Sequence, residues 1–196
     1  MTLSENPVKH DTSRVSVLGM TTATVVAAIL VILQLALVPT LFPTNAVGIA
    51  TPLLPVALIA AWGTARDPIE IVPALFVTAT GLGAVSTEQV GWFLIALLPT
   101  AVIAITIRAL PIRTPSRHHQ PAHETQLAVV IIRAAAAAAV GASAYLSILT
   151  IASGEPTLLP TLGTSIGSAA AWSTAFASVT VLLLHLLRPQ RHGLFG

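Results

Sequence analysis

Three histidines are the residues whose type and spacing most suggest chemistry. His118 or His119, paired with His123, has a spacing found in zinc sites. Pro121 interrupts this segment, and no second histidine pair or nearby aspartate completes a set of ligands. A solvated basic loop is therefore the favoured interpretation, and we expect neither a metal site nor a bound cofactor.

The acidic residues do not form a catalytic arrangement. Asp67, Glu70, Glu88 and Glu155 all lie close to predicted turns, too near the membrane surface to form a proton relay. The chain contains no cysteine, which excludes a thiolate nucleophile, a disulfide and a Cys-ligated metal. No Ser, His and Asp residues share a spacing typical of a catalytic triad. We predict that the protein is not an enzyme.

Two polar residues lie inside apolar runs. Arg133 is the one basic residue within a predicted span, roughly 12 Å from its start at about 1.5 Å per residue. A charge inside a membrane is a candidate functional group. The alternative is that its long side chain reaches the headgroups or pairs with Glu124 or Glu70. Gln34, near the end of the first apolar run, is the second candidate.

The composition places these residues in a membrane protein. The chain is 55% hydrophobic and 8% charged, with a mean hydropathy of +0.87, so it has too few charged side chains for a water-soluble surface. Its apolar runs are continuous rather than short and alternating, which favours helices over a β-barrel. The basic residues are scattered, which argues against a nucleic-acid partner. We predict an all-α, polytopic integral membrane protein whose first partner is the lipid bilayer.

The apolar runs predict one domain, residues 17–187, that forms a bundle of six membrane-spanning helices. The second run is short for a full crossing, so we expect it to be tilted or shielded by its neighbours. Before the last span, a piece at 157–167 has the length of a separate interfacial or re-entrant segment. The expected spans are approximately 17–38, 52–65, 68–85, 89–108, 125–152 and 168–187.

The distribution of positive charge predicts the orientation. If both termini are cytoplasmic, the inside segments hold all but one of the nine Lys and Arg residues, and the outside loops hold none. The tails 1–16 and 188–196 and the loop 108–124 are then cytoplasmic. The residues on the inside are Lys9, Arg14, Arg66, Arg108, Arg113, Arg117, Arg188 and Arg191.

Two turns are expected to fix the order of the spans. Asp67 before Pro68, with Glu70 three residues after Asp67, is typical of a capping box at a helix start, here on the cytoplasmic side. Ser86 and Gln89 repeat the same spacing at the following, external turn.

Small residues recur at four-residue spacing. Ala23 with Ala27, and Gly163 with Gly167, are pairs of the kind that allow membrane helices to approach closely. Such pairs serve either packing inside the bundle or contact with a partner, and the sequence leaves both open. Gly163 and Gly167 are candidate partner-contact residues.

Across about residues 25–110 the chain resembles the MreD family of rod-shape-determining membrane proteins. The resemblance lies in a glutamine late in the first span, a second span that ends in a small-residue turn, and glycines in the third span and at the start of the fourth. The residues concerned are Gln34, Gly63, Gly81, Gly83 and Gly91. The chain departs from the family pattern at Ala84 to Ser86, where family members often carry an aspartate, and in its longer segment at 108–124.

The resemblance implies a non-enzymatic scaffold subunit of the cell-elongation machinery, which synthesises peptidoglycan and sets cell shape, in the cytoplasmic (inner) membrane of a bacterium. Its implied partners are an MreC-like bitopic protein and the cell-wall polymerase and transpeptidase subunits. We expect no polar cavity in such a scaffold.

The architecture is also similar to the six-helix substrate-binding components of energy-coupling-factor transporters. That likeness implies the alternative function, a membrane subunit that binds a small, vitamin-type molecule for transport. In this alternative, a pocket between helices would open to the outside, and Ala23 and Ala27 would face the coupling subunit.

Overall fold

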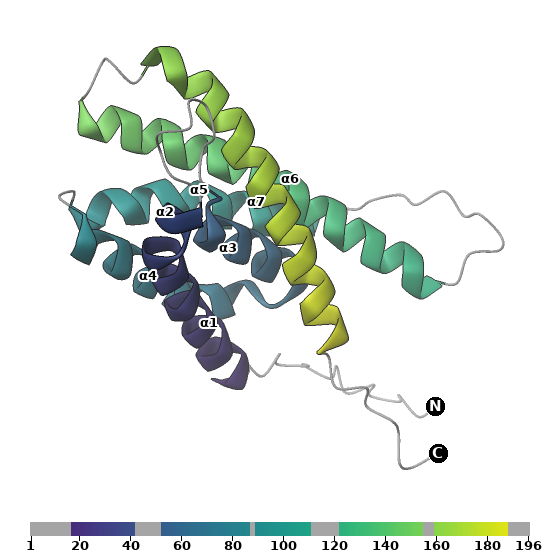
Figure 1. Cartoon of the computed structure of the whole chain (residues 1–196). Helices are drawn as coiled ribbons and strands as arrows, with labels where there is room; N and C mark the ends of the chain where they lie inside the picture. The colour runs from purple at the N-terminus through teal and green to yellow at the C-terminus, as the bar shows by residue number, and fades with distance from the viewer. Residues whose placement is uncertain (1–16, 42–51, 87–88, 111–121, 155–158, 188–196) are drawn as a thin grey trace, which may run out of the picture.

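The computed structural model describes residues 17–41, 52–86, 89–110, 122–154 and 159–187 of the chain (Figure 1). Within these ranges every regular element is a helix, which confirms the all-α prediction. Two of the elements, α2 and η1, are single short turns next to longer helices. The elements are α1 (Val17–Ala36), α2 (Val38–Leu41), α3 (Leu54–Ala65), η1 (Pro68–Glu70), α4 (Ile71–Val85), α5 (Val90–Ala109), α6 (Ala122–Ser153) and α7 (Leu159–Leu186).

Five helical segments of the described chain are long and apolar enough to cross a membrane. By helix length and hydropathy the chain is therefore a multi-pass membrane protein. These segments agree with five of the six expected spans. They are Val17–Leu41, Pro68–Val85, Val90–Ala109, Gln126–Ser153 and Gly163–Leu186.

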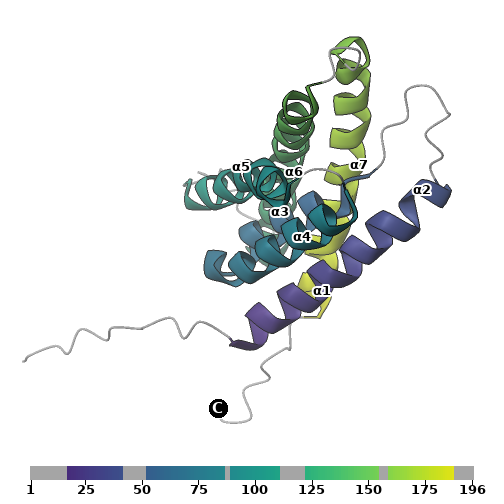
Figure 2. The same ribbon diagram turned by 90° about the vertical axis from the view of Figure 1, so that its left-hand side faces the viewer.

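Helix α3 is the exception, because its 12 residues cover only about 18 Å. Every residue from Leu54 to Thr64 is buried. The helix contacts α1, α4, α5, α6 and α7, and both views place it in the interior of the bundle (Figures 1 and 2). The expectation that the second apolar run is shielded by its neighbours is confirmed.

The contacts of α3 show how far this short helix reaches. At its start, the backbone N–H of Leu54 donates a hydrogen bond to the side chain of Gln34, near the end of α1. Just beyond its end, the carboxyl group of Glu70 lies directly against Gly19, near the beginning of α1. Helix α3 and the turn after it therefore run antiparallel to most of α1.

Most small residues in the bundle serve internal packing. Ala23 and Ala27 are buried on α1, which packs mainly on α4. A Cβ atom at Gly81 of α4 would lie 2.8 Å from Cγ1 of Val31, so the glycine is required for this approach. Gly141 of α6 has the same role against Thr100 of α5.

Helix α7 is continuous over 28 residues, from Leu159 to Leu186. The expectation of a separate interfacial or re-entrant piece at 157–167 is wrong for residues 159–167. Pro160 lies in the first turn of the helix, where a backbone N–H has no partner within the helix, so the proline does not interrupt it.

Both predicted capping boxes are wrong. Asp67 precedes η1 without making a side-chain capping hydrogen bond. Ser86 follows the end of α4, and the N-cap residue of α5 is Gln89, which also makes no side-chain cap. At the first turn the physical reason is clear, because the Glu70 carboxylate binds the indole of Trp62 instead of the backbone.

Candidate functional site at the two ends of α3

At the start of α3, a side chain from another helix takes the place of a local cap. The Oε1 atom of Gln34 accepts a hydrogen bond from the backbone N–H of Leu54 at 3.0 Å. Leu53, the N-cap residue, offers no side-chain acceptor, and Pro55 has no N–H. Because lipid cannot satisfy a free N–H, Gln34 anchors the start of the buried helix to α1.

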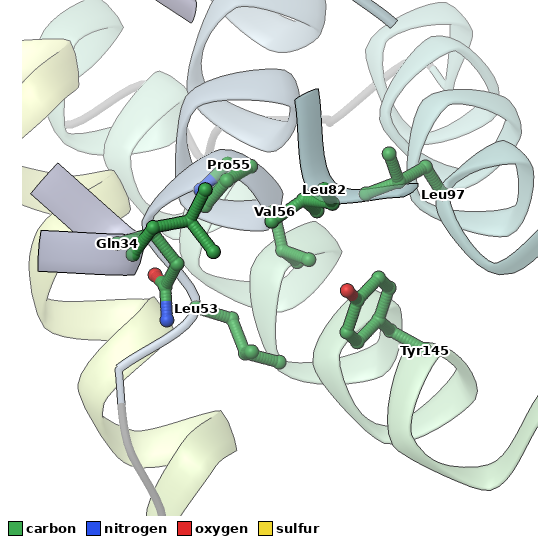
Figure 3. Close-up of a pocket in the computed structure, with 8 residues that line it drawn as sticks. Gln34, Leu53, Pro55, Val56, Leu82, Leu97 and Tyr145 are labelled. Atoms are coloured by element: carbon green, nitrogen blue, oxygen red, sulfur yellow. The ribbon is translucent and has the colours of Figure 1, made fainter. Parts of the chain in front are cut away.

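Beside this anchor lies a partly open cavity of about 210 Å³, lined by residues of α1, α4, α5 and α6 and of the start of α3 (Figure 3). Six of its lining residues are apolar, among them Val56, Leu82 and Leu97, and the two polar ones are Gln34 and Tyr145. The described lining of this cavity is therefore mostly apolar.

Tyr145 projects from α6 into this region. Its side chain is only 6% exposed, and its hydroxyl group points toward Val56 and Leu82 (Figure 3). Among the described residues, none forms a hydrogen bond with this hydroxyl. Sequence reasoning missed Tyr145, although it is the only tyrosine of the chain and lies within an apolar, alanine-rich helix.

The opposite end of α3 contains a buried carboxylate with a defined partner. Nε1 of Trp62 donates a hydrogen bond to Oε2 of Glu70 at 2.9 Å, and the two side chains are 3% and 4% exposed. Gly19 completes the enclosure, because a Cβ atom at this position would collide with the carboxyl group. Glu70 was expected near the membrane surface, whereas the protein itself buries it.

Two arginines bind carbonyl groups at helix ends on this side of the bundle. The guanidinium group of Arg108 donates a hydrogen bond to the carbonyl of Arg66, the residue that follows α3. Nη2 of Arg133 donates to the carbonyl of Leu110, which follows α5, at 2.5 Å. Positive groups at these positions donate hydrogen bonds to free carbonyls and interact favourably with the negative end of each helix dipole.

Only part of the Arg133 guanidinium group is hydrogen-bonded to described residues. Its Nε atom is buried and has no hydrogen-bond partner among the described residues, while Nη2 binds Leu110. Glu70 is bound to Trp62, so the expected pairing of Arg133 with Glu70 is wrong. Arg133 joins α6 to the end of α5.

Gly163 and Gly167 have an environment unlike that of the packed glycines. Both are exposed, and a Cβ atom at either position would meet nothing within 4 Å. Ala171 and Ala175 continue the same four-residue spacing and are also exposed. We call these four residues the α7 stripe. Sequence reasoning found only its first half, although the same spacing predicts the rest.

Several sequence-based candidates lie outside the described residues. They include the topology-setting arginines Arg113, Arg117, Arg188 and Arg191, the histidines His118 and His119, and the side chains of His123 and Glu124. Within the described part of the chain, no group of three or more His, Cys, Asp or Glu residues is placed to hold a metal ion.

Comparisons with family models, with curated proteins and with solved structures found no match to this chain. The resemblance to the MreD family remains a prediction from the sequence.

Proposed function

We propose that this protein is a non-enzymatic membrane scaffold that binds partner membrane proteins through helix–helix contacts, and that it serves the cell-elongation machinery of a bacterium. The observation that carries the proposal is the α7 stripe. The small-residue positions on α1, α4 and α6 are filled by neighbouring helices, whereas a Cβ atom at Gly163 or Gly167 would meet nothing within 4 Å and the two alanines of the stripe are exposed.

The stripe fits one transmembrane helix of a partner. From Gly163 to Ala175 the stripe rises through 12 residue steps of α7, or about 18 Å at 1.5 Å per residue. Small residues at this spacing let two backbones approach closely, and van der Waals contact then drives association within lipid. In Figure 1, α7 crosses in front of the other helices, so a partner helix has access to its outer face. We assign this position to the single membrane-spanning helix of an MreC-like protein.

The orientation proposed for this scaffold places both termini in the cytoplasm. Arg108 binds the carbonyl of Arg66, next to the turn whose Glu70 lies against Gly19 near the beginning of α1, and Arg133 binds the carbonyl of Leu110, two residues after Arg108. Cytoplasmic segments are rich in Lys and Arg, so this arrangement supports six crossings with that end inside. The bacterial cytoplasmic membrane is the proposed location.

The test enlarges the stripe without disturbing the bundle. Gly167→Leu and Ala171→Leu each add a side chain where the structure leaves open space or an exposed surface. Each variant should fold normally, lose co-purification of the MreC-like protein, and give rounded cells when it replaces the wild-type protein in the native host. Co-purification and cell shape are the two measurements.

A matched control variant lies on α6. Ala136→Leu makes the same change at another exposed alanine, and it should keep both the partner and the rod shape. Retained partner and normal shape in both stripe variants would contradict the proposed contact. Normal shape after depletion of the whole protein, together with failed uptake of one vitamin, would contradict the scaffold function itself.

A second candidate function is the small-molecule carrier subunit, and the cavity beside Gln34 and Tyr145 is the observation that favours it. The specific coupling face expected for this candidate is not available, because Ala23 and Ala27 are buried against the rest of the bundle. A carrier of this kind would have to contact its coupling subunit through another surface.

A further inference from the structure

We infer that the cavity at the start of α3 is a binding site for a small, mostly apolar molecule that carries a carboxylate or carbonyl oxygen. The inference is independent of the α7 stripe and of the scaffold function. It is a premise of the carrier function, so a cavity without a ligand would remove the second candidate and leave the first unchanged.

The volume and the lining of the cavity indicate the size of the ligand and its mainly apolar character. An engineered apolar cavity of about 150 Å³ holds benzene, so a cavity of about 210 Å³ has room for one ring and a small polar group. None of the described lining residues carries a charge, and six of these eight are apolar. Most of the ligand surface must therefore be apolar as well.

The Tyr145 hydroxyl sets the first polar requirement. A tyrosine buried in a membrane bundle normally gives its O–H a hydrogen-bond partner, because an unpaired donor in an apolar environment is costly. This hydroxyl points into the cavity region and has no partner among the described residues (Figure 3). An acceptor atom on a bound molecule would satisfy it.

Gln34 and the α3 dipole indicate the same chemistry. Oε1 of Gln34 is occupied by the N–H of Leu54, while its Nε2 group donates to no described residue. Leu53, Pro55 and Val56 form one wall, so the positive end of the α3 dipole lies beside the cavity. Two donors without a partner among the described residues, together with a positive helix end, favour an oxygen acceptor, in the way that helix starts inside transporters bind anionic groups of their substrates.

The location of the cavity indicates the side from which it is filled. Gln34 lies near the end of α1 and Leu53 at the start of α3, opposite the end that carries Arg66, Arg108 and Arg133. If the arginine-rich end is cytoplasmic, the ligand binds in the outer half of the bundle.

Fluorine NMR offers a direct test, because Tyr145 is the only tyrosine of the chain. Protein labelled with 3-fluorotyrosine gives one signal from the cavity wall. Benzoate and benzamide supply a ring with a charged or a neutral oxygen acceptor, and toluene supplies the ring alone. Benzoate, benzamide or both should shift this signal at concentrations where toluene does not.

Two variants connect the signal to the site. Tyr145→Phe keeps the ring and removes the hydroxyl, so it should weaken binding of the acceptor-bearing probe about tenfold, measured by saturation-transfer NMR on unlabelled protein. Leu82→Phe adds bulk to the cavity wall and should abolish the fluorine shift. Equal binding of all three probes, or of the best probe to wild type and Tyr145→Phe, would overturn the inference.

A lipid acyl chain is the competing occupant of an apolar cavity in a membrane. Native mass spectrometry can detect a lipid that stays bound to the purified protein. We expect no lipid that binds to wild type and to Tyr145→Phe but is absent from Leu82→Phe. Such a lipid would overturn the inference, because an acyl chain needs the space but not the hydroxyl.

Discussion

At the end of α3 that contains Trp62, the polar groups are paired: the indole with Glu70, and the guanidinium of Arg108 with the carbonyl of Arg66. At the end that contains Leu54, one amide oxygen of Gln34 holds the helix, while the Gln34 Nε2 group and the Tyr145 hydroxyl have no partner among the described residues. The hydrogen bonds of the first end stabilise the fold, whereas the second end adjoins the cavity that we propose as a binding site. We call them the paired end and the open end.

The largest effect is expected at the paired end, for Trp62→Phe. The change keeps an aromatic ring but leaves a buried carboxylate without its indole donor, which should destabilise the protein by about 2–3 kcal/mol. Unfolding in mixed micelles of a mild detergent and sodium dodecyl sulfate measures the loss.

Trp92→Phe is the matched control for this change, because Trp92 is 38% exposed on α5 and should tolerate phenylalanine with little cost. If Trp62→Phe is no more destabilising than Trp92→Phe, the Trp62–Glu70 hydrogen bond does not stabilise the paired end.

Gln34→Leu should have an intermediate effect at the open end. Leucine has a similar length but no acceptor, so the N–H of Leu54 loses its cap and the protein should lose about 1 kcal/mol. The same unfolding titration measures this loss. Ile32→Leu, two residues before Gln34 and on the exposed side of α1, should be neutral. If Gln34→Leu is no more destabilising than Ile32→Leu, the hydrogen bond between Leu54 and Gln34 does not stabilise the open end.

The contrast between the two ends also explains what the sequence could predict. Continuous apolar runs were sufficient to predict the five long spans, because helix length and hydropathy are local properties. The partners of Glu70 and Tyr145 were not predictable. Glu70 is buried because Gly19, far away in the chain, leaves room for its carboxyl group. Tyr145 and Gln34 line the same cavity only because α6, α3 and α1 pack together.

The same limit applies to the small residues. Ala23 with Ala27 and Gly163 with Gly167 have the same spacing, yet the first pair is buried and the second is exposed. Spacing along one helix shows that a close approach is possible. Which helix makes the approach depends on how the whole bundle assembles, and that information is spread over the complete chain.

The smallest effect is expected for Tyr145→Phe in the absence of ligand. The hydroxyl has no partner among the described residues, so removing it breaks no hydrogen bond, and the ring still fills its position on the cavity wall. The free energy of unfolding should stay within about 0.5 kcal/mol of wild type. A loss of 1 kcal/mol or more in the same titration would reveal a partner for this hydroxyl within the protein, and the open end would then be as fully paired as the other.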